Sequence, residues 1–589
     1  MGSPVWDTSI PLPKHSILVQ TSSSNQSKSN VMKRIVYILL LFVMGACQKD
    51  FLQLPISNST TTDSVFSTTI KAQSAIANAY QRSLCQGIPY QGFWNSMITD
   101  NISGALTYGF AWTWGNGIAT STGLTASGNI EDMDGYAFNF TAIRQAYLVK
   151  ENIDKVTDMS GSDKAIVKAE MQALVAYRYE QMFIMYGGVP VLSKSLTVND
   201  DLSVPRAPLK EVLDSITSWC DAAAAVLPSQ WPATFTGRMT KAAALSIKAK
   251  ALLYAARPLF NTGTPYLDFG ANNGLICLGN SDPARWQQAA LAAEAGIKEA
   301  ELNGGAKIIN TGNPLDDYGT ATSTPSNAEV LLAFKSESGN LNTFFNMHNW
   351  QAYGNGLTTN YLEFYYKADG TNQVWPTSST AFSDYLTRIQ DMEPRFKASF
   401  KAWEIDTWNN PNDDYWSNKT LFQWQSNVCA FPVKFYYKAG TRGWFEFPIF
   451  RLAALYLNAA EAYNEMGQPA EALTKLNVIH QRAGLPAITE TDQAALRTII
   501  QREWAVEFFD ENYWLHDIKH WKRSDIGNGL IGGGIRTLKF NTQTGGKQTG
   551  NTDYEDGVLY QGFWAPRQYL NPFPQTEINK GTLIQNPGY

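Results

Sequence analysis

The feature that most limits the fold is a pair of apolar stripes at helical spacing, separated by a glycine and a proline. The first stripe contains Leu452, Leu455, Tyr456, Ala459, Tyr463 and Met466, and the second contains Ala472, Leu473, Leu476 and Ile479. Apolar residues that recur every three or four positions favour an amphipathic helix. Gly467 is suited to ending the first helix, and Pro469 is suited to the first turn of the next. The sequence therefore predicts two antiparallel helices, the second ending before Gly484-Leu485-Pro486.

Other stretches also favour helix. Residues 240–257 and 285–303 are rich in alanine, which favours helix and lets neighbouring helices approach closely. Two more helices are expected at residues 171–186, before Gly187-Gly188-Val189-Pro190, and at residues 210–227. The helix pairs resemble tetratricopeptide hairpins, and the two alanine-rich helices would form a second pair. The strict sequence period of about 34 residues that marks such repeats is not found.

Three stretches, residues 95–140, 304–445 and 525–589, are rich in Gly, Asn and Thr and have few periodic runs. Long ordered loops on a rigid scaffold are where binding commonly occurs. The predicted fold class is therefore mainly α. It consists of a tetratricopeptide-like helical-hairpin scaffold with a large loop-rich lobe that carries the ligand site.

The start of the chain has the pattern of an export signal. Met32-Lys33-Arg34 is followed by ten apolar residues at 35–44, then by Gly45-Ala46 and Cys47. A positive start and a short apolar run are typical of a secretory signal, and ten residues are too few to span a bilayer. A cysteine directly after Gly-Ala resembles the lipobox of a bacterial lipoprotein, in which that cysteine is lipidated. The alternative is an ordinary signal with a chance cysteine.

On the lipoprotein interpretation, residues 1–31 are an upstream extension and residues 32–46 are a signal peptide. The mature chain is then 47–589, attached to a membrane through lipid on Cys47.

Composition argues against several other classes of partner. The net charge is −5, which gives no positive surface for nucleic acid. The remaining cysteines are widely spaced and contain no C-x-x-C pair, so we expect mostly buried thiols and no zinc site. We also expect no cofactor. These cysteines are Cys85, Cys220, Cys277 and Cys429.

Aromatic residues give the strongest indication of a ligand. They make up 13% of the chain, and four of them fall within residues 108–115. Alternate residues of an extended segment share one side, so these rings would form one stacking surface. A second cluster, residues 346–354, interleaves rings with amides. The candidate ligand-binding residues are Tyr108, Trp112, Trp114, Trp350 and Tyr353 for the faces of sugar rings, with Asp100 and Asn349 for the hydroxyl edges.

The alternative is that these rings pack the loops onto the scaffold. Further candidates in the other long loop region are Trp375, Trp403, Trp408, Trp416, Trp424 and Trp444.

Three other motifs favour structural interpretations. His516-Asp517-Ile518-Lys519-His520 has two histidines at zinc-binding spacing, but Asp replaces the usual Glu base, so we interpret it as a packing helix. Gly527-Asn528-Gly529-Leu530-Ile531-Gly532 matches a dinucleotide pattern without standing between a strand and a helix, so we interpret it as a flexible loop. An acidic cluster at helical spacing beside Arg502 and Lys519 is interpreted as a salt-bridged face rather than a set of catalytic carboxylates. It comprises Glu503, Glu507, Asp510 and Glu511.

Several segments, taken in order, resemble the SusD/RagB family of outer-membrane nutrient-binding lipoproteins. Besides the lipobox they are Tyr177-Arg178-Tyr179, Tyr186-Gly187-Gly188-Val189-Pro190, Val204-Pro205-Arg206, Gly237-Arg238-Met239-Thr240, Pro394-Arg395-Phe396, Phe450-Arg451-Leu452-Ala453, Arg502-Glu503, Glu507-Phe508, Asp517-Ile518, Trp521, Phe573-Pro574-Gln575-Thr576-Glu577-Ile578 and Gln585-Asn586-Pro587-Gly588-Tyr589. Each segment is weak alone. Their order over nearly the whole mature chain carries the resemblance.

The resemblance implies an N-terminal SusD-like part at 47–235 and a C-terminal SusD/RagB part at 236–589. It implies a non-enzymatic, surface-exposed lipoprotein of the outer membrane of a Gram-negative bacterium. Members capture oligosaccharides, or peptides in some branches, and cover a SusC-like TonB-dependent transporter. Trp-rich loops favour a glycan over a peptide as the ligand. A glycoside hydrolase on a helical scaffold is a further alternative, although no carboxylate pair in the sequence points to one.

Overall fold

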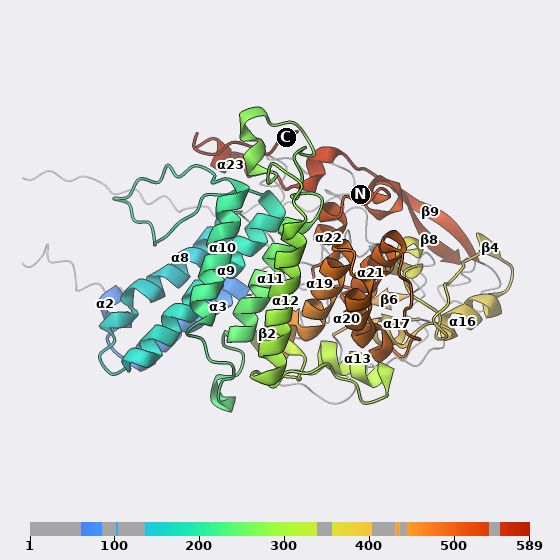
Figure 1. Ribbon diagram of the computed structural model, residues 1–589, viewed down its shortest axis with the longest axis horizontal. Coiled ribbons are helices and arrows are strands. Elements are labelled where there is room, and N and C mark those ends of the chain that lie inside the picture. The colour runs from blue at the N-terminus through green and yellow to red at the C-terminus, as the bar shows by residue number, and fades with distance from the viewer. Residues whose placement is uncertain are drawn as a thin grey trace, which may run out of the picture. The chain divides into compact units, whose positions relative to one another are not determined.

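The computed structural model (Figure 1) describes residues 61–84, 102–103, 136–337, 356–402, 430–432, 434–435, 444–540 and 554–589. The chain divides into two compact units, Met1–Thr61 and Thr62–Tyr589, and every element below belongs to the second. Among the helices within these ranges, none is long and apolar enough to cross a membrane.

Helices predominate in the described residues, as the sequence predicts. The first group is α2 (Thr62–Val65), α3 (Thr69–Leu84), α8 (Tyr136–Asn152), α9 (Gly161–Tyr186), α10 (Leu209–Ala224), α11 (Lys241–Ala256) and α12 (Ala284–Leu302). The second group is α13 (Pro314–Ser323), α15 (Thr359–Leu362), α16 (Phe382–Gln390), α17 (Pro394–Ser399), α19 (Leu452–Glu465), α20 (Pro469–Arg482), α21 (Gln493–Glu507), α22 (Trp514–His520) and α23 (Gln575–Ile578). The long helices pack in succession, α8 on α9, α9 on α10, α10 on α11, α11 on α12, α12 on α19 and α19 on α20 (Figure 1).

The predicted hairpin is α19 followed by α20. Gly467 adopts φ +71°, a left-handed conformation that glycine tolerates and most other residues do not. Pro469 occupies the first turn of α20, where its missing N–H has no helical partner to lose. The second predicted pair, α11 and α12, is also confirmed. At Gly296 of α12 an added Cβ would lie 2.9 Å from a methyl carbon of Leu455, so the absence of a side chain lets α12 approach α19 closely.

The loop-rich stretches contain more regular structure than the sequence predicts. Within the part of the chain that the structure describes, strands form one three-stranded sheet and three two-stranded sheets, all antiparallel. The sheets pair β1 (Ile102–Ser103) with β3 (Gly356–Leu357), β2 (Val330–Glu337) with β7 (Trp444–Arg451), β5 (Phe400–Lys401) with β6 (Phe431–Pro432), and β4 (Ser378–Ser379) with β9 (Tyr554–Gly562) and β8 (Gly533–Phe540). Each two-stranded pair joins segments far apart in sequence, and such non-local pairing leaves only a weak local signal.

One large cluster of buried apolar side chains runs through the described part of the chain, from Phe66 to Leu583. Helix α9 lies in its middle, because almost every residue from Met171 to Tyr186 is buried. A helix that is buried on all sides belongs to a core rather than to a surface. Cys220 and Cys277 are buried free thiols, as predicted, whereas Cys85 and Cys429 lie outside the described residues.

Candidate functional site

All seven candidate ligand-binding residues lie outside the described residues, and so does Cys47. Their roles therefore remain predictions. Of the further candidates, Trp403, Trp408, Trp416 and Trp424 also lie outside the described residues. Trp444 is the first residue of β7, and the remaining candidate, Trp375, is described with its side chain. Its side chain is buried and its ring packs near those of Tyr385 and Tyr554, so it is part of the core.

The described residues next to the two aromatic clusters are paired with each other. In the β1–β3 ladder Ile102 faces Leu357 and Ser103 faces Gly356. The pairing is antiparallel, so the chain that follows Ser103 and the chain that precedes Gly356 leave the ladder at the same end. The first cluster begins five residues after Ser103, and the second ends two residues before Gly356. The ladder thus joins the two segments that carry the clusters at one point.

Strand β3 is fixed to the core on its other side. The N–H of Leu357 donates to the carbonyl of Ala430 at 2.8 Å, and the Leu357 side chain is fully buried. The chain then enters the short helix α15, where the Tyr361 hydroxyl donates to the carbonyl of Ala505 in α21. The segment that follows the second cluster, β3 and α15, is therefore hydrogen-bonded directly to the last turn of α21.

Side chains from distant segments cap this end of α21. The last carbonyls of a helix have no partner within the helix, and a buried helix end needs donors from elsewhere. Tyr318 of α13 donates its hydroxyl to the carbonyl of Glu507 at 2.9 Å, and Arg451 donates to the same oxygen at 3.1 Å. The ammonium group of Lys434 donates to the carbonyl of Phe509 at 2.5 Å.

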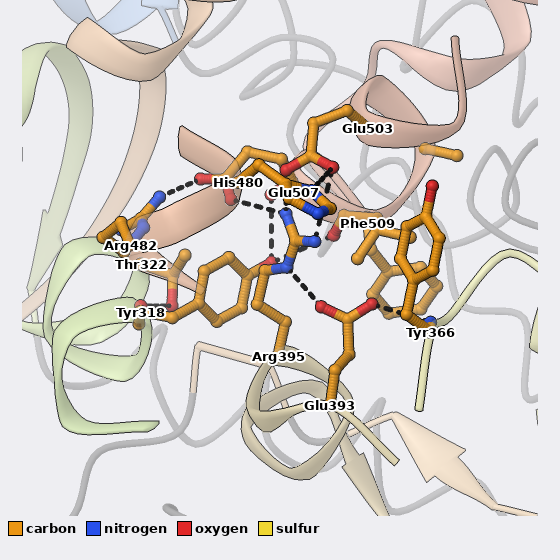
Figure 2. A network of polar contacts seen from close by, with 12 residues as sticks. Tyr318, Thr322, Tyr366, Glu393, Arg395, His480, Arg482, Glu503, Glu507 and Phe509 are labelled. Atoms are coloured by element: carbon orange, nitrogen blue, oxygen red, sulfur yellow. Dashed lines mark hydrogen bonds and ion pairs between the residues drawn. The ribbon is translucent and has the colours of Figure 1, made fainter. Parts of the chain in front are cut away.

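The carboxylates of the same helix end form a buried ionic network, part of which is drawn in Figure 2. Glu503 accepts from Arg395 at 2.6 Å and contacts Nδ1 of His480 at 2.9 Å. Arg482 at 2.5 Å and Arg451 at 2.9 Å both donate to Oε1 of Glu507.

Three more carboxylates belong to the network. Glu393 pairs with Arg395 at 2.7 Å. Glu511 pairs with Lys434 at 2.7 Å and with two nitrogens of Arg451, and Glu329 pairs with Arg451 at 2.7 Å. Every side chain of these ion pairs is at most 1% exposed.

The network keeps the carboxylates of Glu503 and Glu507 charged. Burial alone would raise the pKa of Glu503, but the positive charge of Arg395 and the hydrogen bonds with Arg395 and His480 outweigh it and hold this pKa well below its usual range. Burial likewise acts to raise the pKa of Glu507, and Arg482, Arg451 and Arg395 lower it overall. Carboxylates that are ionised, saturated with donors and shielded from solvent are placed to fasten segments together.

The predicted salt bridges of this acidic cluster are thus present, but the predicted partners are wrong. Among the described contacts, Glu503 and Glu507 pair with cations from other segments, and neither pairs with Arg502 or Lys519. Arg502 instead donates to the carbonyl of Phe364 and lies 3.4 Å from the ring centre of Tyr366. The prediction rests on proximity in the sequence, whereas the fold brings cations from distant segments closer to these carboxylates.

The paired histidines lie on α22, as the packing interpretation predicts. Nε2 of His520 contacts the carbonyl of Ile184 at 3.0 Å, and Asp517 accepts from Arg257 and Tyr254 at 2.5 Å each. Burial lowers the pKa of both His516 and His520 well below the usual value. Within the described ranges no group of three or more His, Cys, Asp or Glu side chains is arranged to hold a metal ion.

The glycine-rich motif lies mostly in the short π-helix η7 (Ile526–Leu530), between α22 and β8, so it is not the predicted flexible loop and does not connect a strand to a helix. Gly529 has φ +104°, and an added Cβ there would lie 2.6 Å from Nδ2 of Asn360. The motif therefore allows a close backbone approach to α15, which explains the glycines without a nucleotide.

The family can be decided from comparisons with known proteins. A model described as "SusD family" matches residues 315–589, and one described as "Starch-binding associating with outer membrane" matches residues 51–253. The chain belongs to the SusD/RagB family. The curated SusD-like protein P38 of Formosa agariphila is 24% identical over 387 residues, which cover 62% of this chain and 68% of that protein.

Solved structures of SusD-like proteins have the same fold. A SusD-like protein from Bacteroides fragilis matches with a TM-score of 0.70 and 22% identity, over 90% of this chain and 98% of that one. A structure described as a laminarin-binding SusD-like protein matches with a TM-score of 0.55 and 18% identity, over 89% of this chain and 100% of that one.

The segments that carry the SusD/RagB resemblance meet in the structure. Arg395, Arg451, Glu503 and Glu507, each from a separate quoted motif, form the ionic network. A second group of motifs meets at Arg206, which donates to the carbonyl of Gly188 at 2.7 Å and to Oδ1 of Asn586 at 3.0 Å. Arg206 also lies 4.6 Å from the ring centre of Phe573. These family residues hold the fold together.

Removing one cation tests the ionic network. Arg451→Met leaves Glu329, Glu507 and Glu511 short of a buried donor, so we expect the free energy of unfolding to fall by about 3–5 kcal/mol. The matched control is Lys210→Met, which removes an exposed pair with Asp214 and should change this free energy by at most about 0.5 kcal/mol. Urea unfolding of both variants measures the difference. Equal, small effects would show that the network does not stabilise the fold.

Glu503 predicts a loss of stability in acid. Its pKa in the folded protein lies below the ordinary value of about 4.3, so the unfolded state takes up the proton first as the pH falls. The stabilisation is present above that ordinary value and is lost as the pH falls toward the depressed one. We expect the urea midpoint of the wild type to drop between about pH 5 and pH 3. Glu503→Gln should be less stable at neutral pH and lose less of its midpoint over this range. Identical slopes for the two proteins would contradict this role.

Proposed function

We propose that this protein binds an oligosaccharide at the cell surface through residues of both aromatic clusters and passes it to a SusC-like TonB-dependent transporter. The observation that carries the proposal is the β1–β3 ladder, which joins the segments of the two clusters at one end. The first cluster offers a row of rings, and the second interleaves rings with amides. Joined at one end, they can act on a single ligand.

The chemistry of the two clusters fits a sugar. A pyranose ring has an apolar C–H face and a hydroxyl edge, and Trp or Tyr rings can cover the face. The first cluster supplies Trp112 and Trp114, and the second supplies Trp350 and Tyr353, with the amide of Asn349 next to Trp350 in the sequence. Ligand sites of this kind combine apolar walls with a few placed polar groups.

The descriptions of similar proteins also support glycan binding. One matching family model carries the words starch-binding and outer membrane in its description, and one solved structure of this fold is described as laminarin-binding. Together with the lipobox at Cys47, these descriptions favour a lipid-anchored, surface-exposed binding protein of the outer membrane rather than an enzyme. If the protein belongs to a peptide-binding branch of the family, we expect it to bind a peptide instead of a glycan.

Removing single rings tests the ligand site. Each of Trp112→Ala, Trp114→Ala, Trp350→Ala and Tyr353→Ala should keep the wild-type melting temperature and bind glycan about tenfold more weakly or worse. The binding partner is first found on a glycan array and then titrated by calorimetry, with a parallel hydrolysis assay. Phe563→Ala, which removes an exposed ring outside both clusters, is the control and should change neither quantity.

Two outcomes would count against this site. If the rings pack the loops, each variant should lose roughly 3–5 kcal/mol of stability, and binding should fail only as the protein unfolds. Wild-type affinity in all four variants would place the ligand elsewhere. Release of shortened sugars by the wild type would support the hydrolase alternative instead.

Attachment to the membrane depends on Cys47. Cys47→Ser should abolish incorporation of radiolabelled fatty acid and release the protein from the outer-membrane fraction. Replacing Ser57, which lies beyond the proposed lipidation site, by Ala is the control and should leave both measurements unchanged. Retention of Cys47→Ser in the outer membrane, with no labelled lipid on the wild type, would overturn the lipoprotein prediction.

The transporter partner can be tested by purification. In a gentle detergent, an affinity-tagged copy of this protein should bring down a large TonB-dependent barrel over a broad interface. A detergent extract in which a control SusC–SusD pair stays assembled provides the comparison. Recovery of this protein alone from such an extract would contradict the proposed delivery step.

A further inference from the structure

A groove of about 250 Å³ lies on the helical scaffold, between the loop that joins α10 to α11 and the first residues of β2. The loop contributes Gln230, Trp231, Thr236 and Arg238 to its lining, and the other wall includes Ser326 and Lys335. None of these residues belongs to either aromatic cluster. The groove is therefore separate in sequence from the proposed ligand site.

The indole ring of Trp231 is held in place at the groove. Its Nε1 donates to the carbonyl of Met239 at 2.9 Å, and the guanidinium of Arg238 lies 4.2 Å from the ring centre. Arg238 is itself fixed, because its Nε donates to the buried carboxylate of Glu170 at 2.7 Å. The Tyr80 hydroxyl donates to the same carboxylate at 2.6 Å and accepts from the N–H of Met239 at 2.7 Å. A half-buried ring fixed on two sides loses little freedom when a ligand stacks on it.

The charges around the groove are balanced. Arg238 pairs with Glu170, and Lys335 lies 3.4 Å from Glu446. Two cations and two carboxylates leave no excess charge to attract a phosphate or a carboxylate ligand. The remaining polar lining is made of amides and hydroxyls, among them Gln230, Thr236 and Ser326. Such a surface suits a ligand that is neutral, has an apolar face and presents many hydroxyl groups.

We propose that this groove is a second carbohydrate-binding site, which takes a short stretch of a neutral oligosaccharide on the indole ring of Trp231. Small-molecule sites usually have volumes of about 300–1,000 Å³, so a groove just below this range fits a few sugar units of a longer chain. Paired sites on one molecule raise the avidity for a long polysaccharide without further contacts at either site.

Fluorine NMR of the protein labelled with 5-fluorotryptophan tests the proposal. The Trp231 resonance is assigned by its disappearance in Trp231→Phe, and maltoheptaose, laminarihexaose and xylohexaose are titrated one at a time. We expect at least one of the three to shift the Trp231 resonance in a saturable way. The shift should persist in the Trp112→Ala/Trp350→Ala double variant, because the groove shares no residue with the clusters. This variant also separates the groove from the cluster site. If only the cluster site is lost, the sugar should no longer shift the resonances of other tryptophans and should still shift that of Trp231.

Variants provide the affinity test. Trp231→Ala should weaken binding at the groove by about five- to a hundredfold, and Trp231→Phe, which keeps a flat ring, should recover most of it. Phe563→Ala is the control, because Phe563 is an exposed ring that does not line the groove. It should bind like the wild type, and melting curves confirm that each variant is folded.

Three results would overturn the proposal. The first is an unchanged Trp231 resonance with all three sugars. The second is a shift that disappears in the double variant, which would make it a remote effect of the cluster site. The third is a shift caused by a tryptic digest of casein and by none of the sugars, which would make the groove a peptide site.

Discussion

The last turn of α21 ends inside the protein, and the surrounding structure depends on how that buried end is satisfied. Its carbonyl oxygens accept from Tyr361, Tyr318, Arg451 and, at 3.5 Å, Lys434, and each donor comes from a different segment. An unpaired charge in such an environment is strongly destabilising, so the network is stable only when its members are all in place. We infer that the network selects one arrangement of these segments over others. This role is distinct from its contribution to the free energy of unfolding.

This arrangement connects the scaffold to the proposed ligand site. Glu329 precedes β2, Lys434 and Arg451 lie on either side of residues 436–443, and Arg395 lies shortly before β5. Tyr361 follows β3, whose ladder with β1 joins the segments of the two aromatic clusters. The same buried charges therefore fix the described ends of several segments that the sequence marks as rich in aromatic residues. The helical array of α8 to α12 and α19 to α21 supplies the rigid body on which this junction is built (Figure 1).

Local patterns in the sequence predict the α19–α20 hairpin and do not predict the junction. The stripes through Leu452 and Ala472, and the punctuation at Gly467 and Pro469, predict α19 and α20 closely because their causes are local. Helix α13 is not among the predicted helices, although Asn313 caps it and Pro314 occupies its first turn, and both are local features of the sequence. The partners of Glu503 and Glu507 were not predictable, because Arg395, Arg451 and Arg482 reach them only through the fold.

Hydrogen exchange with and without a bound glycan tests the central claim most directly, because it reports on both aromatic segments and on the junction in one measurement. The account predicts that an oligosaccharide slows exchange in residues 104–115 and 346–355 together, over the same range of ligand concentration. Amides in residues 357–362 and 500–511 should exchange slowly whether or not the ligand is present. Protection of only one of the two aromatic segments, or rapid exchange throughout residues 500–511, would contradict it.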